Sequence, residues 1–206
     1  MAVKARQFYA TLSEVAKRAS KDETLPPICA VQFVVKNNVL FMIATDRFKV
    51  AVGRIEAEDL EDGTWLAGRG DVEALLGTMR AHKLGSTKSD KNLVELSPGE
   101  TWKIVTQRGV ELTLRADWDA DFPKVPGFLK NDWDGGIVVS GDKIGADKNF
   151  NYGFSEQNAL SPQFFVSAPN AEFDVVGVVM PINTKGHADK TPWDKANDLW
   201  EELEVK

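Results

Sequence analysis

Phe41-Met-Ile-Ala-Thr-Asp-Arg-Phe-Lys-Val-Ala-Val-Gly-Arg-Ile55 is the stretch that decides the fold, because two apolar runs in it flank the polar step Thr45-Asp46-Arg47. β-Branched residues in both runs predict two consecutive strands that meet at a tight turn. Upstream, apolar residues alternate in 31–35 and 39–43, and Asn37-Asn38 between them favours a hairpin turn because Asn tolerates positive φ. The sequence therefore predicts a three-stranded antiparallel meander.

Residues 4–21 are predicted to form an amphipathic helix. Its apolar residues follow the spacing of one buried stripe, with Phe8, Leu12, Val15 and Ala19. The cations on the opposite side or its flank are Arg6, Lys17, Arg18 and Lys21, and Glu14 is the only acid. Such a face is either an ordinary solvated surface or a surface for an anionic partner, and the helix alone favours the first.

A second helix is predicted after an acidic loop at 56–62 and a short strand at 64–67. Asp71 can cap this helix, and its apolar face consists of Val72, Leu75, Leu76 and Met79. Its outward positions are small, with Ala74, Gly77, Thr78 and Ala81. Basic residues gather at its two ends, as Arg69 and as Arg80, His82 and Lys83. This surface either lies close to a bulky partner or is simply solvated.

Three short strands are predicted next, at 93–96, 102–106 and 110–114, separated by strong turn signals. The first 115 residues thus contain one unit twice, a helix followed by a three-stranded meander, and the repetition is structural rather than literal. The expected fold class is α+β.

A shorter second region follows. It is predicted to contain strands at 136–139, 163–168 and 173–179 and a short helix at 140–150. The tail has the start signals of a helix in Thr191, Pro192 and Asp194. Its apolar face would consist of Trp193, Ala196, Trp200 and Leu203. Such a helix either packs on its parent domain or docks into a groove, its own or a partner's.

Composition narrows the class of protein. The chain has 206 residues, of which 43% are hydrophobic, so it can bury a core. Because it contains neither an apolar run of membrane-spanning length nor a signal-peptide core, a cytoplasmic protein without a membrane partner is expected. The net charge of −6 argues against nucleic acid unless the cations are clustered. Cys29 lies in an apolar run and is expected to be a buried small hydrophobe rather than a catalytic thiol.

The sequence contains no complete motif for phosphate binding, metal binding or catalysis. The segment Gly63–Gly70 has the glycine spacing of a phosphate-binding loop but lacks its Lys and Ser/Thr, and His82 and His187 lack metal-ligand spacing. A metal site at Asp117, Asp119 and Asp121 is conceivable, although solvated charge is the usual explanation. The sequence therefore predicts a protein that is not an enzyme and has no catalytic residue, cofactor or metal.

Several motifs in order resemble one family. They are the basic helix, Leu25-Pro26-Pro27-Ile28, residues Ala44 to Val52, Trp65-Leu66-Ala67-Gly68-Arg69, Asp121-Phe122-Pro123 and Val179-Met180-Pro181-Ile182. This succession resembles the bacterial DNA polymerase III beta subunit, the sliding clamp, over nearly all of residues 1–183. The resemblance implies the DNA clamp fold, in which repeated units place sheets outside and helices along an inner face. It also implies a homo-oligomeric ring that encircles double-stranded DNA without reading its sequence.

The resemblance assigns roles to particular residues. It implies that DNA faces Arg6, Lys17, Arg18, Lys21, Arg69, Arg80 and Lys83. It implies a hydrophobic pocket for peptides of DNA polymerases and clamp loaders, formed by Thr45, Arg47, Phe48, Lys49, Val50, Pro126, Val179, Met180, Pro181 and Ile182. For Val50 and Val179 core packing is the stronger interpretation even in a clamp.

The chain departs from the family pattern in three ways. Arg47-Phe48-Lys49 stands where a small residue, His and Arg are usual, the second region is shortened, and the tail has no counterpart. The expected domains are a complete clamp-like domain at 1–128, a shortened one at 129–190 and a helical tail at 191–206. The expected function is a DNA-sliding processivity factor, and the alternative is an interaction module that keeps the pocket without forming a ring. A compact, divergent clamp of this kind suggests a phage or mobile-element origin.

Overall fold

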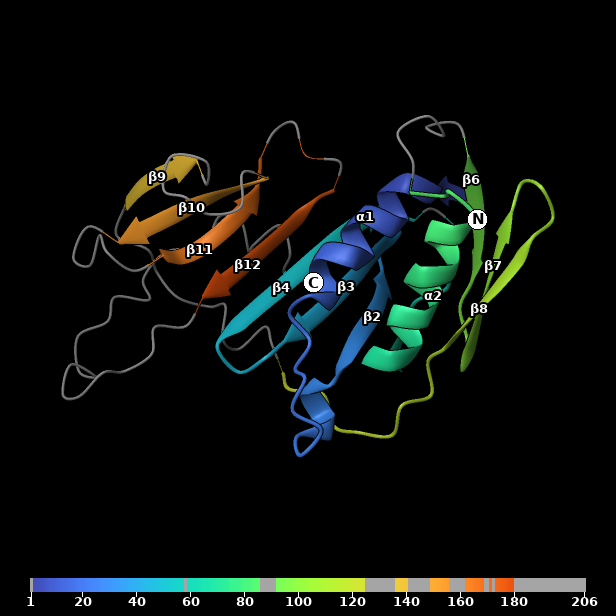
Figure 1. The fold of residues 1–206 in the computed structure, drawn as a ribbon, viewed down its shortest axis with the longest axis horizontal. Coiled ribbons are helices and arrows are strands. Elements are labelled where there is room, and N and C mark those ends of the chain that lie inside the picture. The colour runs from blue at the N-terminus through green and yellow to red at the C-terminus, as the bar shows by residue number, and fades with distance from the viewer. Residues whose placement is uncertain are drawn as a thin grey trace.

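The computed structural model describes residues 2–57, 59–85, 92–124, 136–140, 149–155, 162–168, 171 and 173–179. In this part of the chain, two antiparallel sheets stand behind two α-helices (Figure 1). The smaller sheet has the order β1-β6-β7-β8, and its strands are β1 (Ala2–Lys4), β6 (Leu93–Ser97), β7 (Thr101–Thr106) and β8 (Glu111–Arg115). The larger sheet has the order β5-β2-β3-β4-β12-β11-β10-β9.

The first half of the larger sheet is the meander that the sequence predicted. Its strands are β2 (Ala30–Lys36), β3 (Val39–Thr45) and β4 (Lys49–Glu56), with β5 (Gly63–Gly68) added beside β2. Asn37 and Asn38 form the first hairpin turn with φ of 50° and 63°, which confirms the Asn-Asn prediction. The three strands predicted over 93–114 are also confirmed to within a residue at each end.

The repeated unit is larger than predicted, because each copy begins with a short strand. β1 precedes the first helix but pairs with β6, at the edge of the second meander. β5 precedes the second helix but pairs with β2, at the edge of the first meander. Each unit therefore completes the sheet of the other, which ties the two into one body. The sequence analysis missed β1, since three residues are too few to show an alternating pattern.

Both helices lie on the same side of the larger sheet, in front of β2, β3 and β4 in Figure 1, and the smaller sheet stands beside α2. Helix α1 (Ala5–Ala16) packs on β3 and β4, whereas α2 (Arg69–Ala81) packs on β8 and β5. The predicted apolar stripes are confirmed as buried, with Phe8, Leu12, Val15, Ala19, Val72, Leu75, Leu76 and Met79. The small outward residues of α2 are confirmed as exposed. The expected arrangement, with both helices on one face and sheets behind them, is present.

The predicted helix ends need correction. Helix α1 stops at Ala16 rather than at Lys21, because Arg18 and Ala19 already bond three residues back and Ser20 donates its N–H to Ile28. Asp71 is not the cap of α2, which begins at Arg69 with Gly68 before it. Asp71 instead lies in the first turn, where its carboxylate complements the positive end of the helix dipole.

The second region continues the same sheet. Its strands are β9 (Gly136–Ser140), β10 (Phe150–Ser155), β11 (Pro162–Ser167) and β12 (Val175–Val179). β12 pairs with β4, from Val175 opposite Gly53 to Val179 opposite Lys49. A side chain at Gly177 would overlap the carbonyl oxygen of Val50 and the ring of Phe165, so this junction requires glycine. The first region and the second thus share one eight-stranded sheet.

The predicted short helix at 140–150 is wrong at both ends, because Ser140 lies in β9 and Phe150 begins β10. The aromatic residues of this segment alternate as in a strand, and the sequence analysis missed β10 because polar Asn and Gly residues interrupt that pattern. Strands β9, β11 and β12 are confirmed. The helical tail predicted from Thr191 lies outside the described residues.

Candidate functional site

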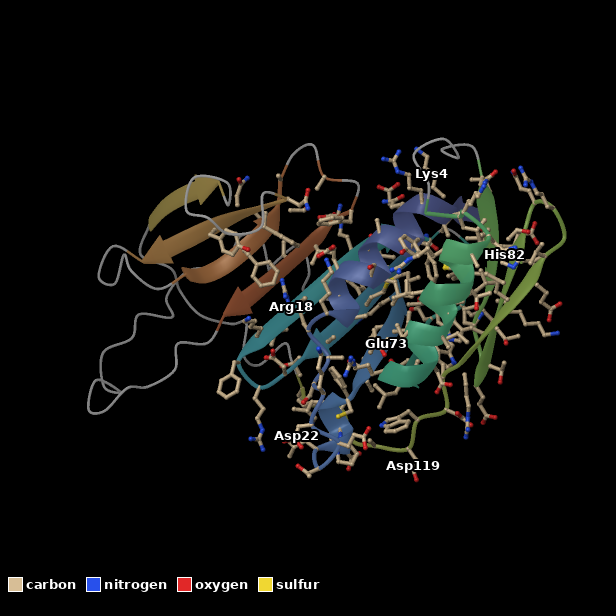
Figure 2. The ribbon with its side chains drawn as sticks, viewed as in Figure 1. Lys4, Arg18, Asp22, Glu73, His82 and Asp119 are labelled. Atoms are coloured by element: carbon tan, nitrogen blue, oxygen red, sulfur yellow. The ribbon has the colours of Figure 1, made fainter. Side chains whose placement is uncertain are left out.

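Two surfaces were predicted from the sequence: a basic helix face and a pocket at the β3–β4 turn. The cations of the first surface lie on α1, on α2 and on the segments that follow each helix. Figure 2 shows the helix side, where Arg18, Glu73 and His82 are labelled. The structure adds the partners of these cations, which the sequence analysis did not assign.

Arg18 is engaged with the second region. It follows the end of α1, and its guanidinium carbon lies 5.2 Å from the centre of the Phe165 ring on β11. Phe165 is itself buried and packs edge-to-face on Phe150. The Nε atom of Arg18 is buried and finds no hydrogen-bond acceptor among the described residues. Cation–π attraction therefore attaches the end of α1 to the second region, and Arg18 is less available to a ligand than the sequence suggested.

Two further cations are paired with acids of their own helix. Lys17 forms an ion pair with Glu14, and Arg69 forms one with Glu73 one helical turn later. The Lys17 and Glu73 side chains are about half exposed, at 50% and 54%. The other partner of each pair is more buried, at 11% for Glu14 and 25% for Arg69. The Arg69–Glu73 pair is thus the more exposed of the two, and exposed ion pairs contribute little to stability. The carboxylates of Glu14 and Glu73 lower the net positive charge of the helix face.

Arg80 connects the two helices. Its Nε donates a hydrogen bond to the hydroxyl of Tyr9 on α1 at 3.2 Å. The Tyr9 ring packs closely against Gly85, where any side chain would overlap the ring. Arg80 and Lys83 are both exposed at the C-terminal end of α2, where cations also complement the helix dipole. The structure therefore brings the cations of α2 and the face of α1 together at this end.

The remaining two predicted cations lie at opposite ends of α1. Arg6 is half-buried in its first turn, and Lys21 is exposed in the segment after it. The predicted helix reached Lys21, and this is wrong because α1 has already ended. Helix geometry therefore no longer places Lys21 on the face of Lys17.

The β3–β4 turn is a rigid corner made by residues 45–49. The Asp46 carboxylate accepts hydrogen bonds from the N–H groups of Phe48 and Lys49, at 3.0 and 2.8 Å. The Thr45 hydroxyl accepts one from the N–H of Arg47. Arg47 has φ of 80°, the left-handed region that non-glycine residues rarely adopt. These bonds define the corner, which is more constrained than the strand-turn-strand pattern predicted.

The corner presents an aromatic ring to solvent. Phe48 is 49% exposed and Arg47 is exposed beside it, whereas Lys49 is half-buried. Thr45 and Val50 point inward, and Val50 belongs to an apolar cluster on the sheet face opposite the helices, formed by Phe41, Ile43, Val50, Val52, Val176 and Val178. The expected core role of Val50 is thus confirmed.

A carboxylate lies close to this corner. Hydrogen bonds from the hydroxyl and the N–H of Thr24 hold the pKa of Asp22 below its usual range, and nearby Arg47 adds a smaller effect in the same direction. Asp22 therefore stays ionised at neutral pH and offsets part of the charge of Arg47.

The other wall of the predicted pocket is not described. Only Val179 belongs to the described residues, as the last residue of β12 opposite Lys49. The positions 126 and 180–182, that is Pro126, Met180, Pro181 and Ile182, lie outside them. The pocket itself therefore remains a prediction.

No metal centre or membrane helix emerges from the described residues. No three of their His, Cys, Asp and Glu side chains are grouped closely enough to hold a metal ion. Asp117 instead accepts a hydrogen bond from Arg115 at 2.6 Å, which lowers the pKa of the Asp117 carboxyl. Cys29 is buried, and its thiol donates to the carbonyl of Asp22. Neither described helix has the length and apolar character needed to cross a bilayer.

The sequence analysis missed the residues that hold or neutralise the cations. Glu14 and Glu73 were detectable, because they stand three and four residues from Lys17 and Arg69, the spacing at which helix side chains meet. Tyr9 and Phe165 were not, because their partners Arg80 and Arg18 are remote in the sequence.

Comparison with known proteins supports the sliding-clamp resemblance. No protein-family model matches the chain. Solved structures do: the beta subunit of DNA polymerase III from Thermotoga maritima has a TM-score of 0.65 at 15% identity, over 89% of this chain and 65% of that one. The sliding clamp from Bacillus subtilis has a TM-score of 0.67 at 13% identity, over 89% and 64%. The beta subunit from Pseudomonas aeruginosa has a TM-score of 0.58 at 14% identity, over 90% and 65%.

These identities are low, so the likeness concerns the fold. The chain spans about 65% of the length of the clamps that it matches. The matched structures are described as sliding clamps or as beta subunits of DNA polymerase III. The predicted fold class and the resemblance to the family are confirmed at this level: the chain has the fold of the bacterial DNA polymerase III beta subunits, the sliding clamps.

Proposed function

We propose that this protein is a sliding-clamp-like processivity factor, which encircles duplex DNA as a cytoplasmic homo-oligomer and tethers a replicative polymerase. The observation that carries the proposal is the clamp fold itself, with both helices on one face and continuous sheets behind them. A ring of such units would turn its helices toward the hole and its sheets toward solvent.

DNA contacts in this proposal are made by the cations of the helix face. The exposed members are Lys17, Lys21, Arg80 and Lys83, and Arg6 and Arg69 stand at the starts of the two helices. Contacts of this kind go to phosphates, so they position DNA without reading its sequence. Lys17 and Arg69 would exchange their carboxylate partners for phosphate, which costs little because both pairs are partly exposed.

Peptides of a polymerase and of a clamp loader would bind at the corner of residues 45–49. The exposed Phe48 ring supplies an apolar contact, and Arg47 and Lys49 set the charge preference. Val179 and the positions 126 and 180–182 would form the facing wall. In the same proposal residues 1–128 are a complete clamp-like domain, 129–190 a shortened one and 191–206 a helical tail.

Topological binding to DNA tests the ring. The chain is loaded onto nicked circular plasmid by a clamp loader, and the complex is isolated by gel filtration. A ring stays on the circle and is released when a restriction enzyme linearises it, because it slides off the ends. Equal retention on circular and linear DNA, or a strict monomer by light scattering at micromolar concentration, would contradict the proposal.

The second candidate is a clamp-derived interaction module that keeps the peptide site but forms no ring. Two observations favour it: the chain spans about 65% of the clamps that it matches, and four of the predicted DNA-facing cations already have partners within the chain. Phe48→Ala should abolish polymerase-peptide binding in either candidate, because both use the corner. Retention on circular DNA, measured with the unsubstituted chain so that the loader can still bind the corner, separates the two: a ring is retained and a module is not.

A further inference from the structure

The corner of residues 45–49 has features that ordinary folding does not explain. Phe48 and Trp118 are the two large apolar side chains of the described residues that are strongly exposed, at 49% and 40%. Trp118 is anchored, since its Nε1 donates to the carbonyl of Pro26 and its ring covers Gly68. The Phe48 ring has no polar atom that could anchor it in this way, and the Phe48 N–H donates to Asp46 Oδ1. A single exposed ring is common on protein surfaces, so Phe48 marks a docking site only together with the features beside it.

The backbone of the corner supports the same interpretation. A left-handed conformation costs a non-glycine residue roughly 1–2 kcal/mol, yet Arg rather than Gly occupies it at position 47. Four hydrogen bonds hold the turn. The N–H groups of Phe48 and Lys49 donate to Asp46 Oδ1, and the N–H of Arg47 donates to Thr45 Oγ1. The N–H of Asp46 donates to the carbonyl of Lys49. Strain that is held in place this firmly is found most often at functional sites.

Strand register identifies which part of the chain begins beside this corner. Val179 at the end of β12 lies opposite Lys49 at the start of β4. Residues 180–206 are joined to Val179, so the chain leaves β12 opposite Lys49. The eleven residues 180–190 can reach at most roughly 36 Å from this point, which puts residues 191–206 within reach of the corner.

The chemistry of residues 191–206 matches the corner. The segment carries Trp193, Leu199, Trp200 and Leu203, which offer apolar contacts to the Phe48 ring. Its acids, Asp194, Asp198, Glu201, Glu202 and Glu204, outnumber Lys195 and Lys206. Arg47 and Lys49 at the corner are cationic, and the charge of Asp46 is directed into the turn, where it accepts two N–H groups. Asp22 offsets part of the charge of Arg47, which leaves Lys49 as the cation that it does not neutralise. Aromatic and electrostatic complementarity thus coincide.

We propose that the chain's own segment 191–206 docks on the corner formed by Arg47, Phe48 and Lys49. Tethering gives the segment an effective concentration on the order of 1 mM, so an intrinsic Kd of about 0.1 mM would leave the corner roughly nine-tenths occupied. The docked segment would compete with partner peptides, and this consequence alone rests on the function proposed above. Docking itself requires neither DNA nor a polymerase.

Paramagnetic relaxation in the full-length chain tests the docking. Lys206→Cys carries a nitroxide label, and buried Cys29 stays unlabelled, which the labelling of the unsubstituted chain checks. The amide signals of residues 46–49 are expected to lose at least half of their intensity relative to the reduced label. Trp193→Ala together with Trp200→Ala should restore them, and so should Phe48→Ser, whose exposed position leaves the rest of the spectrum unchanged.

Three outcomes would overturn the proposal. Unbroadened signals at 46–49 mean that the segment does not dock, and broadening confined to other strands means that it docks elsewhere. Broadening that appears only when a labelled chain is mixed with an isotope-labelled one means that a second copy occupies the corner. Because no DNA or partner peptide is present, each result is independent of the plasmid test of ring formation.

Discussion

Helices α1 and α2 occupy equivalent places in the two repeated units but make different surfaces. α1 lies tightly on the larger sheet, where Thr11 and Val15 would overlap any side chain at Gly53. It also contains buried polar atoms without partners, at Thr11 Oγ1 and Glu14 Oε2. α2 instead exposes small residues, and a side chain at Gly70 or Gly77 would meet no atom within 4 Å.

The difference indicates a division of roles between the helices. α1, whose end is attached to Phe165 through Arg18, joins the first region to the second. α2 is open toward solvent and has its cations at its ends. The repeated fold thus supplies one helix that joins the two regions and one whose outer face is open to solvent.

The largest expected effect is on the fit of α1. Gly53→Ala should destabilise the protein by about 1–3 kcal/mol, because its methyl group overlaps Thr11 and forces the helix from the sheet. Gly77→Ala in α2 is the matched control and should stabilise by roughly 1 kcal/mol, since alanine favours helix and the space is open. Urea denaturation measures both. Equal shifts of the two variants would remove the contrast between the helices.

Arg18 and Arg80 separate stability from DNA binding. Arg18→Ala should cost about 1 kcal/mol of stability through the lost contact with Phe165 and change DNA affinity little. Arg80→Ala should leave stability nearly unchanged and reduce the slope of log affinity against log salt by about 1.

Each of the two arginine substitutions has a control variant that keeps the positive charge. Arg18→Lys keeps the charge of Arg18, and Tyr9→Phe removes the acceptor of Arg80 without removing a cation. Thermal melts and binding to a short duplex at several salt concentrations give the two readouts. A reduced salt slope with unchanged stability in Arg18→Ala would instead place Arg18 against DNA.

Smaller effects are expected from the acids that pair with the cations. Glu14→Gln and Glu73→Gln each remove an exposed or partly exposed pair, so stability should fall by only about 0.3–0.5 kcal/mol. DNA affinity at low salt should rise in both variants, because Lys17 or Arg69 loses its carboxylate. If α2 is the more open surface, the rise is greater for Glu73→Gln. Unchanged affinity in both would mean that the helix face does not meet DNA.

The smallest effect concerns pH. Folding lowers the pKa of Asp22 through bonds from Thr24 and the pKa of Asp117 through Arg115. Each carboxylate therefore adds stability above its unfolded pKa, near 3.9, and that stability disappears as the pH falls through the folded value. Asp117→Asn should flatten the decline of the melting temperature with acid. Asp22→Asn should flatten it as well, and it should lower the melting temperature at neutral pH only slightly, because Asn still accepts the bonds from Thr24.

Much of the fold was predictable from local pattern. The stripes of α1 and α2, the Asn37-Asn38 hairpin and the meander over 93–114 follow from side-chain period and turn chemistry, which short windows contain. The errors occur where a few residues depend on distant partners. β1 is a strand because β6 pairs with it, and α1 ends at Ala16 because Ser20 bonds to Ile28.

The candidate sites divide in the same way. The sequence identified the cations of the helix face and the residues of the corner, because charge and turn signals are local. It did not identify that Arg80 is held by Tyr9, that Arg18 lies on Phe165, or that Phe48 is half exposed. These contacts join residues many positions apart, so no local pattern encodes them.

The stretch Phe41–Ile55 contains both kinds of feature, those set by neighbouring residues and those set by distant contacts. Sequence alone determined two strands and a polar turn, because β-branched alternation and an Asp at the turn act within a few residues. Only the tertiary structure decided that the second of these strands also pairs with β12, which places Lys49 beside Val179 and makes one continuous sheet. That pairing depends on Gly177, more than a hundred residues away, where any side chain would overlap the backbone of Val50.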